Sequence, residues 1–501
     1  MDDGEIFTRL QAASVRVARE RSVESVREVR KELEKVTGCL THYKDYLLFP
    51  HIIILKTTHK CSWELQEEIV GVIHEVLYRS TIEDLIFFQE IFTQLFFILT
   101  DKTDPQKVGN ISEDCKKTAL ASVSLLVQNS SDSVREEVYA DAFRPQLGHA
   151  IYITLKLIQE EKNRSLKLQA IETLLSLGQK KSFESLPKQQ QDVLSTTYAN
   201  FLPGILMALT RVATADEKQG HKVTALALDA WSYFVMLVMR DNFLSKHVTA
   251  LGEGATVARL HKQLFGEKDQ DSNKKTQLPS KDNKFMLLQP QENLSSKTIN
   301  IEITSEWVDK TAERVSLLVQ SLAKLVTYSH WRVRLSLVHW AQQLICNCCR
   351  SLSGGVILAV EVIVGLRSDD IVDVGTAAQD ALLAVTEALE VRSQHTHSQQ
   401  GLLELLEERV YALSTQLPTI CRQQDPFELL SIKPSLGKCF KHFQDVRISE
   451  ALGTTCHLIG YHSNLTLVVD LCLDCLQQST YHQKESLLML TLILQGGFSV
   501  T

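Results

Sequence analysis

Glycine and proline are scarce in this chain of 501 residues, which contains 21 glycines and 10 prolines. Average usage is ~7% glycine and ~5% proline, so this shortage disfavours a turn-rich all-β fold. Runs of alternating β-branched residues bounded by hairpin signals are also missing. Hydrophobic residues make up 44% of the chain, which is enough for a substantial core. The composition therefore predicts a folded protein that is helical almost throughout.

The chain has no strong excess of charge of one sign. It carries 53 basic and 60 acidic residues, a formal net charge of -7, and neither sign forms a long block. Nucleic-acid binding needs basic stripes or patches, so we expect no direct contact with DNA or RNA. The partners of this chain are expected to be proteins.

The N-terminal sequence MDDGEIFTRLQAASVRVARE is charged throughout and lacks the apolar stretch of a secretory signal. Two other segments are strongly apolar, one from Leu85 to Leu99 and one from Val223 to Met239. A bilayer span needs ~20 mostly uncharged residues. The first segment is too short and carries Glu90, and the second carries Asp229. We therefore expect core helices rather than a membrane span.

Motifs of catalysis are missing as well. The sequence contains no GxxxxGK[ST] loop, no GxGxxG after a strand, no HExxH and no GxSxG elbow. His221 and His330 lie at predicted helix starts, where a cap or surface role is expected. The sequence thus predicts no catalytic residue and no cofactor site, and a protein that is not an enzyme.

Eleven cysteines raise the question of a metal site. One cluster is Cys346, Cys348 and Cys349, with His339 upstream; the other is Cys472 and Cys475, preceded by His457 and His462. Structural zinc needs four converging ligands, usually supplied by two short pairs. Both clusters fall in predicted helices, where neighbouring side chains diverge. The prediction is buried thiols in a reducing compartment, with no metal and no disulfide.

A helical packing pattern recurs along the chain. VRLSLVHWA from Val333 and VGTAAQDAL from Val374 both carry small or apolar residues at positions 0, +4, +7 and +8. The same frame fits segments that start at Leu166, at Val223 and, less cleanly, at Cys115, and Leu65, Ile69, Val72 and Ile73 repeat it. These positions share one face of a helix. A recurrence of ~40–47 residues with two helices per unit is typical of HEAT or armadillo arrays. The expected fold is an all-α solenoid of stacked antiparallel helix pairs.

Polar breaks divide this array into helices and blocks. Residues 5–36 are expected to form one or two amphipathic helices, and YLLFPHIIIL from Tyr46 a kinked helix rather than a strand. Residues 266–300 contain few apolar side chains, which predicts a flexible insertion. HEAT-like repeats are expected before it, in 1–265, and after it, in 301–501. Within the insertion, FMLL from Phe285 is either a docking motif or a patch that folds back on a neighbouring helix.

Three stretches resemble a known family. LTHYKDYLLFPHIIILKT from Leu40, FLPGILMALTRVATADEKQGHKV from Phe201 and SHWRVRLSLVHWAQQLICNCCRSL from Ser329 are similar to the TELO two-interacting protein one family. The similarity is collinear over most of residues 1–390. Members of that family are about twice as long, so the chain is expected to correspond to the N-terminal half or to a short isoform.

The resemblance implies a non-catalytic subunit of the TTT complex. Its partners there would be TELO two and TELO two-interacting protein two, together with Hsp-ninety and the RuvB-like co-chaperone machinery. The complex would mature and stabilise phosphatidylinositol-3-kinase-related kinases, among them mTOR, ATM and ATR, and so support TOR signalling and the DNA damage response. The expected location is the cytoplasm, with the nucleus as a second site. The residues alone leave open another HEAT-repeat scaffold or a nuclear transport adaptor, since periodicity does not single out a family.

Overall fold

The computed structural model describes residues 3–57, 62–248, 301–367, 369–395 and 483–498, and scattered helical positions between 453 and 477. The predicted insertion 266–300 and its FMLL segment lie outside the described residues. Cys472, Cys475 and His462 lie outside them too.

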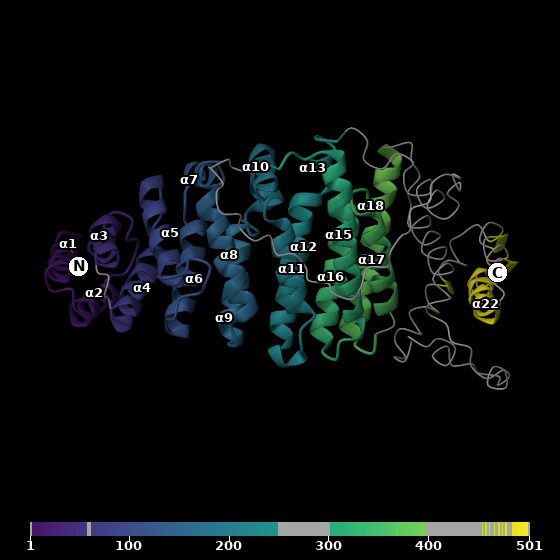
Figure 1. Cartoon of the computed structure of the whole chain (residues 1–501), viewed down its shortest axis with the longest axis horizontal. Coiled ribbons are helices and arrows are strands. Elements are labelled where there is room, and N and C mark those ends of the chain that lie inside the picture. The colour runs from purple at the N-terminus through teal and green to yellow at the C-terminus, as the bar shows by residue number, and fades with distance from the viewer. Residues whose placement is uncertain are drawn as a thin grey trace, which may run out of the picture.

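From α1 to α18, successive long helices alternate between two layers (Figure 1). Each helix packs against the next helix of its own layer, so the layers are continuous. The first layer consists of α1 (Asp3–Glu20), α3 (Lys44–Thr57), α5 (Leu85–Leu99), α8 (Arg144–Glu160), α11 (Leu202–Ala213), α15 (Ser305–Ala323) and α17 (Ser353–Leu366). The second layer consists of α2 (Val23–Lys35), α4 (Trp63–Tyr78), α6 (Glu113–Gln128), α9 (Arg164–Leu177), α12 (His221–Met239), α16 (Trp331–Cys348) and α18 (Val372–His395). This arrangement is the predicted all-α solenoid.

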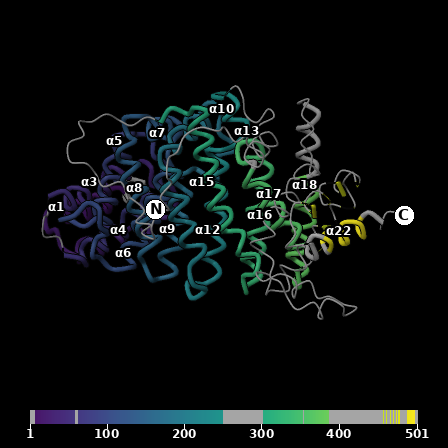
Figure 2. Tube along the Cα trace, turned by 45° about the vertical axis from the view of Figure 1, so that its right-hand side comes forward, coloured from purple at the N-terminus to yellow at the C-terminus, as the bar shows by residue number. Residues whose placement is uncertain are grey.

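Short helices occupy the connections between these units. They are α7 (Asp132–Val138), α10 (Lys188–Ala199), α13 (Asp241–Leu244) and the 3-10 turns η1 (Phe183–Ser185), η2 (Glu217–Gln219) and η3 (Lys324–Thr327), with α22 (Gln483–Phe498) near the C-terminal end. Extended backbone pairing among the described residues is limited to isolated bridges, Ile82 with Ser130 and Thr100 with Val108. The tube in Figure 2 shows the same order of helices from a second side.

Polar residues at the breaks start the helices. The side chains of Ser62, Ser112 and Asn163 accept hydrogen bonds from backbone N–H groups in the first turns of α4, α6 and α9. Such caps satisfy donors that a helix start leaves unpaired. His330 has the same role at α16, where its ring nitrogen accepts from the Arg332 N–H at 3.2 Å. The predicted cap role of this histidine is confirmed.

The recurrent sequence frame is the buried face of the second layer. Its segments form α4, α6, α9, α12, α16 and α18, and every frame position is buried except Leu382, which is partly buried. The position at +4 is alanine in α6, α9, α12 and α18, namely Ala119, Ala170, Ala227 and Ala378. At most steps along the stack the second-layer helices pack more closely than those of the first layer. Small side chains allow that close approach.

The frame does not recur at a constant interval. Its segments start at residues 65, 115, 166, 223, 333 and 374, so the interval of 41 residues between the last two does not describe the rest. The connections that contain α7, α10 and η2 lengthen the N-terminal units. YLLFPHIIIL is helical, as expected, with Pro50 inside α3. The polar stretch SQHTHSQQ from Ser393, whose composition indicates a break between helices, begins inside α18, which extends to His395.

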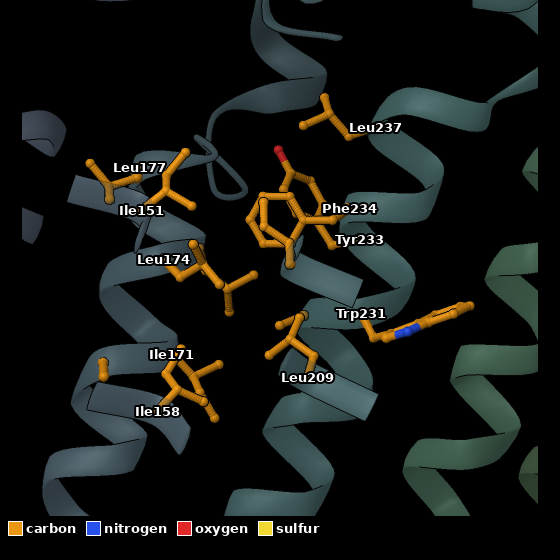
Figure 3. Packing of buried hydrophobic residues seen from close by; sticks show 14 of the residues in the cluster. Ile151, Ile158, Ile171, Leu174, Leu177, Leu209, Trp231, Tyr233, Phe234 and Leu237 are labelled. Carbon is orange, nitrogen blue, oxygen red and sulfur yellow. The ribbon is translucent and has the colours of Figure 1, made fainter. Parts of the chain in front are cut away.

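The core continues across the gap between residues 248 and 301. Helices α12 and α16 pack directly on each other, and the rings of Trp231 and Trp340 lie 5.7 Å apart. Figure 3 shows Tyr233 and Phe234 of α12 pointing into the core with α8 and α9, while Trp231 points toward the next unit. One helical stretch of the described residues, His221–Leu244, is long and apolar enough to cross a membrane, but 72% of its apolar window is buried. This is the predicted core helix.

Candidate partner-binding groove

A groove of about 440 Å³ opens where three units of the second layer meet. One wall is the turn after α9, which leads into η1; the floor and the other wall come from α12 and α16. Its lining combines basic, acidic and aromatic side chains: Lys180, Lys181, Phe183, Glu184, Asp229, Ser232, Tyr233, Met236, Ser336, His339, Trp340 and Gln343. A volume of ~300–1,000 Å³ is typical of binding pockets.

The first wall depends on how α9 ends. Gln179 has a positive φ of 55°, and its N–H donates to the carbonyl of Ser176 at 3.0 Å. The next N–H, of Lys180, reaches back to Leu175 at 3.1 Å. These two bonds form a Schellman motif, which usually has glycine where this chain has glutamine. The motif stops the helix abruptly and directs Lys180 and Lys181 to the groove.

Gly178 allows α12 to approach the end of α9. A Cβ atom added at Gly178 would lie 2.8 Å from the Cε1 atom of Phe234 and 3.1 Å from the Cε1 atom of Tyr233. The Tyr233 hydroxyl donates to the Gly178 carbonyl. Burial raises the pKa of Tyr233, so the phenol stays a neutral donor. This contact fixes the aromatic floor of the groove against the α9 turn.

Charged side chains line the rim in a balanced set. Lys180 is paired with Asp229, and its ammonium lies 6.0 Å from the centre of the Tyr233 ring. Lys181 and Glu184 are exposed. Phe183, which lies beneath them, is 4% exposed and meets Tyr233 edge to face at 6.1 Å. The rim thus offers one charge of each sign beyond the Lys180–Asp229 pair.

The wall from α16 contains a buried donor without a partner. Trp340 has 0% exposure, and its indole Nε1 has no hydrogen-bond acceptor among the described residues. Its neighbour Trp231 is equally buried, but donates to Thr210 Oγ1 at 3.0 Å. Buried polar atoms are nearly always bonded, so an orphan next to a groove needs an explanation. His339 directly precedes Trp340 and Gln343 lies about one turn after it; both are exposed.

The chemistry of the groove is suited to recognition. Ser232 and Ser336 each donate to a carbonyl of their own helix, and Tyr233 donates to Gly178. None of these hydroxyls is hydrogen-bonded to His339 or to a carboxylate, as an activated nucleophile would be. The aromatic floor and mixed rim instead match a protein-binding surface.

The predicted cysteine cluster is divided by the helix. Cys348 and Cys349 are buried and Cys346 is partly buried, while His339 faces the groove on another side of α16. The described part of the chain contains no group of three or more His, Cys, Asp or Glu side chains that could hold a metal. Burial also dominates at Cys115, where it raises the pKa of the thiol to about 12.

Sequence reasoning did not identify this groove. Its residues come from three segments of the chain and meet only through the stacking of α12 on α16. The available signal was the polar stretch KKSFES from Lys180, which places two lysines directly before Phe183 at the end of a helix.

A stacked array of helix pairs in two continuous layers defines a helical-repeat protein. The chain belongs to the TELO2-interacting protein 1 family. Residues 7–370 match the TTI1 N-terminal TPR domain, and residues 428–501 match the second TPR domain of the TELO2-interacting protein 1 homologue. Membership confirms the resemblance found in the sequence.

Two mammalian relatives extend this match. The human TELO2-interacting protein 1 homolog is 23% identical over 98% of this chain and 48% of its own length. The mouse protein of the same name is 24% identical over 84% of this chain and 36% of its own length. The chain therefore spans about half the length, or less, of the curated relatives it matches.

Solved structures with a likeness to the chain include transport receptors. The karyopherin Kap121p bound to RanGTP is 11% identical, with a TM-score of 0.30, over 95% of this chain and 50% of its own. Yeast importin-beta is also 11% identical, with a TM-score of 0.25, over 96% of this chain and 60% of its own. Neither likeness contributes to the assignment of function.

Proposed function

We propose that the protein is a non-catalytic scaffold subunit of the TTT complex. In this role it binds TELO two and TELO two-interacting protein two, and works with Hsp-ninety and the RuvB-like co-chaperone machinery. The complex supports the maturation and stability of phosphatidylinositol-3-kinase-related kinases, including mTOR, ATM and ATR, and through them TOR signalling and the DNA damage response. The observation that carries this proposal is the family match over residues 7–370.

The mechanism we propose is physical scaffolding. A solenoid offers an extended surface to which each repeat contributes a few side chains. Affinity then depends on a few well-buried anchors among many weaker contacts. The groove between α9, α12 and α16 supplies such an anchor, because its floor is aromatic and rigidly packed. Charged side chains at the N-terminal end of the second layer, such as Arg27 with Glu64 and Glu68, add polar contacts elsewhere along the surface.

Quantitative immunoprecipitation tests the proposed assembly. The tagged chain, expressed in cells, should enrich TELO two and TELO two-interacting protein two over a tag-only control. The full-length human relative, tagged in the same way, is the matched positive control because this chain spans about half its length. If the relative enriches both subunits and the chain enriches neither, the proposed role in the complex is wrong for this chain.

Two further properties follow from the proposal. The purified protein should not hydrolyse ATP, because a scaffold needs no phosphate-binding loop. Cell fractionation should place the protein in the cytoplasm, with a second pool in the nucleus where DNA-damage kinases act. Confinement to a membrane or secretory fraction would contradict this placement.

A further inference from the structure

We propose that His221 and His330 form a proton-sensitive latch between two units of the solenoid. The latch is closed while both imidazole rings are neutral, and it opens when the pH falls and a ring takes up a proton. It joins the start of α12 to the turn before α16, two segments on opposite sides of the gap between residues 248 and 301. The latch concerns the solenoid itself, so it goes beyond the proposed function and does not depend on it.

The two rings of the latch stack face to face. Their centres are 3.6 Å apart and their planes differ by 8°. His221 is the first residue of α12, and His330 directly precedes α16. A second link joins the same two segments, because the hydroxyl of Ser329 donates to a carboxylate oxygen of Glu217 at 3.0 Å. The stack and this hydrogen bond together hold the helix starts side by side.

His330 can cap α16 only while its ring is neutral. Its Nδ1 atom accepts from the Arg332 N–H at 3.2 Å, so the single proton of the neutral ring is on Nε2. A second proton has to bind Nδ1, the atom that accepts the cap bond. Protonation therefore removes the cap and leaves a positive charge at the positive end of a helix.

His221 also lies where a positive charge is unfavourable. Its Nε2 atom is buried and has no hydrogen-bond partner among the described residues. Burial, and after it the basic groups of His330, Arg332, Lys222 and Arg164, lower the pKa of His221. The folded state therefore binds fewer protons than the unfolded chain, and the latch loses stability as the pH falls below about 6.5, the ordinary pKa of histidine.

Carboxylates near the latch are already engaged. Glu217 accepts from Ser329, and Asp369 is held by Arg334 in a buried pair. A guanidinium stays close to the rings, since Arg332 lies 5.2 Å from the centre of the Trp331 ring, next to His330. The charged groups on the elements around the pair are Arg164 of α9, Asp216, Glu217 and Lys218 in and before η2, Lys222 of α12, Arg332 and Arg334 of α16, and Asp369 before α18.

The size of the effect follows from the cap and the stack. Loss of a helix cap makes opening of the helix start about two- to thirtyfold more frequent. Two unit charges at the ring separation of 3.6 Å disfavour double protonation by roughly sevenfold even in water, and by more where water is partly excluded. The starts of α12 and α16 should therefore open about tenfold more often at about pH 5.5 than at about pH 7.5.

Hydrogen exchange of the whole chain, measured by mass spectrometry at these two pH values, tests the latch. Rates are corrected for the pH dependence of chemical exchange. Peptides that contain the starts of α12 and α16 should lose about tenfold protection at the lower pH. Peptides from α6, which contains no histidine, should keep their protection and serve as the internal control.

Matched variants separate titration of the pair from general acid sensitivity. His330→Asn keeps a side chain that caps helices well, and His221→Gln keeps a neutral polar group; neither new side chain titrates near neutral pH. The double variant should remain protected at neutral pH and lose the dependence on pH at both helix starts. His339→Gln removes an exposed histidine of α16 outside the pair and should leave that dependence intact.

Three results would overturn the inference. Equal protection of both helix starts at the two pH values would show that the pair does not respond to protons. Slower exchange at the lower pH would show that a protonated ring gains a carboxylate partner such as Glu217. A dependence on pH that persists in the double variant would assign it to another group. Recovery of the TTT subunits by immunoprecipitation is a separate measurement, so the proposed function and the latch can fail independently.

Discussion

The ion pair between Arg334 and Asp369 should hold the last described units of the solenoid together. Its side chains are only 2% and 1% exposed. The bond is bidentate, with Arg334 Nε 2.6 Å from Oδ2 and Nη2 2.7 Å from Oδ1 of Asp369. The guanidinium also donates to the carbonyl of Tyr328 at 2.9 Å, and Asp369 accepts from the N–H of Ile371 at 3.0 Å. The pair therefore ties the start of α16 to the turn before α18.

Removing one partner leaves the other charge buried and uncompensated. Breaking a buried pair in this way costs about 3–5 kcal/mol, whereas replacing both partners by apolar residues is often nearly neutral. Asp369→Asn and Arg334→Met should each destabilise α16 and α18 by that amount. The double variant Arg334→Met with Asp369→Leu should lose much less than the two single effects combined.

Hydrogen exchange measured by mass spectrometry is the assay, because a solenoid opens locally rather than all at once. Since ~1.4 kcal/mol is a factor of ten, each single variant should speed exchange in α16 and α18 by about two to three and a half orders of magnitude. Peptides from α4 and α6 should exchange as in the unaltered protein and serve as the internal control. The reasoning would be refuted if the exchange rate changed less than tenfold in both single variants, or if the effect in the double variant equalled the sum of the two single effects.

Three further predictions concern other parts of the solenoid. Burial lowers the pKa of His51 to about 4, so the unfolded state binds more protons than the folded state between pH 6.5 and 4. The local stability of α3 should therefore fall by roughly 3 kcal/mol as the pH is lowered over that range. Hydrogen exchange in α3 of the His51→Gln variant should lack this pH dependence. Leu337→Asp or Ala378→Asp places an unpaired charge at a fully buried frame position, so each variant should lower the midpoint of thermal unfolding or cause aggregation. The control variant Leu383→Asp, at an exposed site of α18, should do neither. Gly178→Ala should destabilise the turn after α9 by about 1–3 kcal/mol, because the added Cβ atom meets the buried ring of Phe234. The measurement is faster hydrogen exchange in that turn, and an unchanged exchange rate would contradict the contact.

Much of the fold could be predicted because helical packing is a local pattern. The frame at Val223, Ala227, Ala230 and Trp231 lies within nine residues, and its face is buried as expected. Polar breaks were equally informative, since the caps at Ser62 and Ser112 depend on adjacent residues. The interval between repeats could not be predicted in this way, because connections such as α7 and α10 lengthen a unit without changing its packing face.

The groove and the buried ion pair depend on contacts between distant segments. Arg334 is part of the quoted pattern VRLSLVHWA, but nothing nearby indicated that its charge would be buried against Asp369. Trp340 was recognised as a frame position, yet whether its N–H finds an acceptor depends on the neighbours that α9 and α12 supply. Only the stacking of three units reveals that Trp231 has an acceptor and that Trp340 has none within the described part of the chain.

The most direct test of the central proposal is the level of several kinases after acute depletion of the protein in the cells that express it. If the protein is a kinase-maturation scaffold, mTOR, ATM and ATR should fall together while their messenger RNAs stay constant, because immature clients are degraded after synthesis. Adding back the full-length human relative should restore them, and adding back this chain alone shows how much of the function its half of the length carries. Kinase levels that stay unchanged, with the depletion confirmed, would contradict the proposed function.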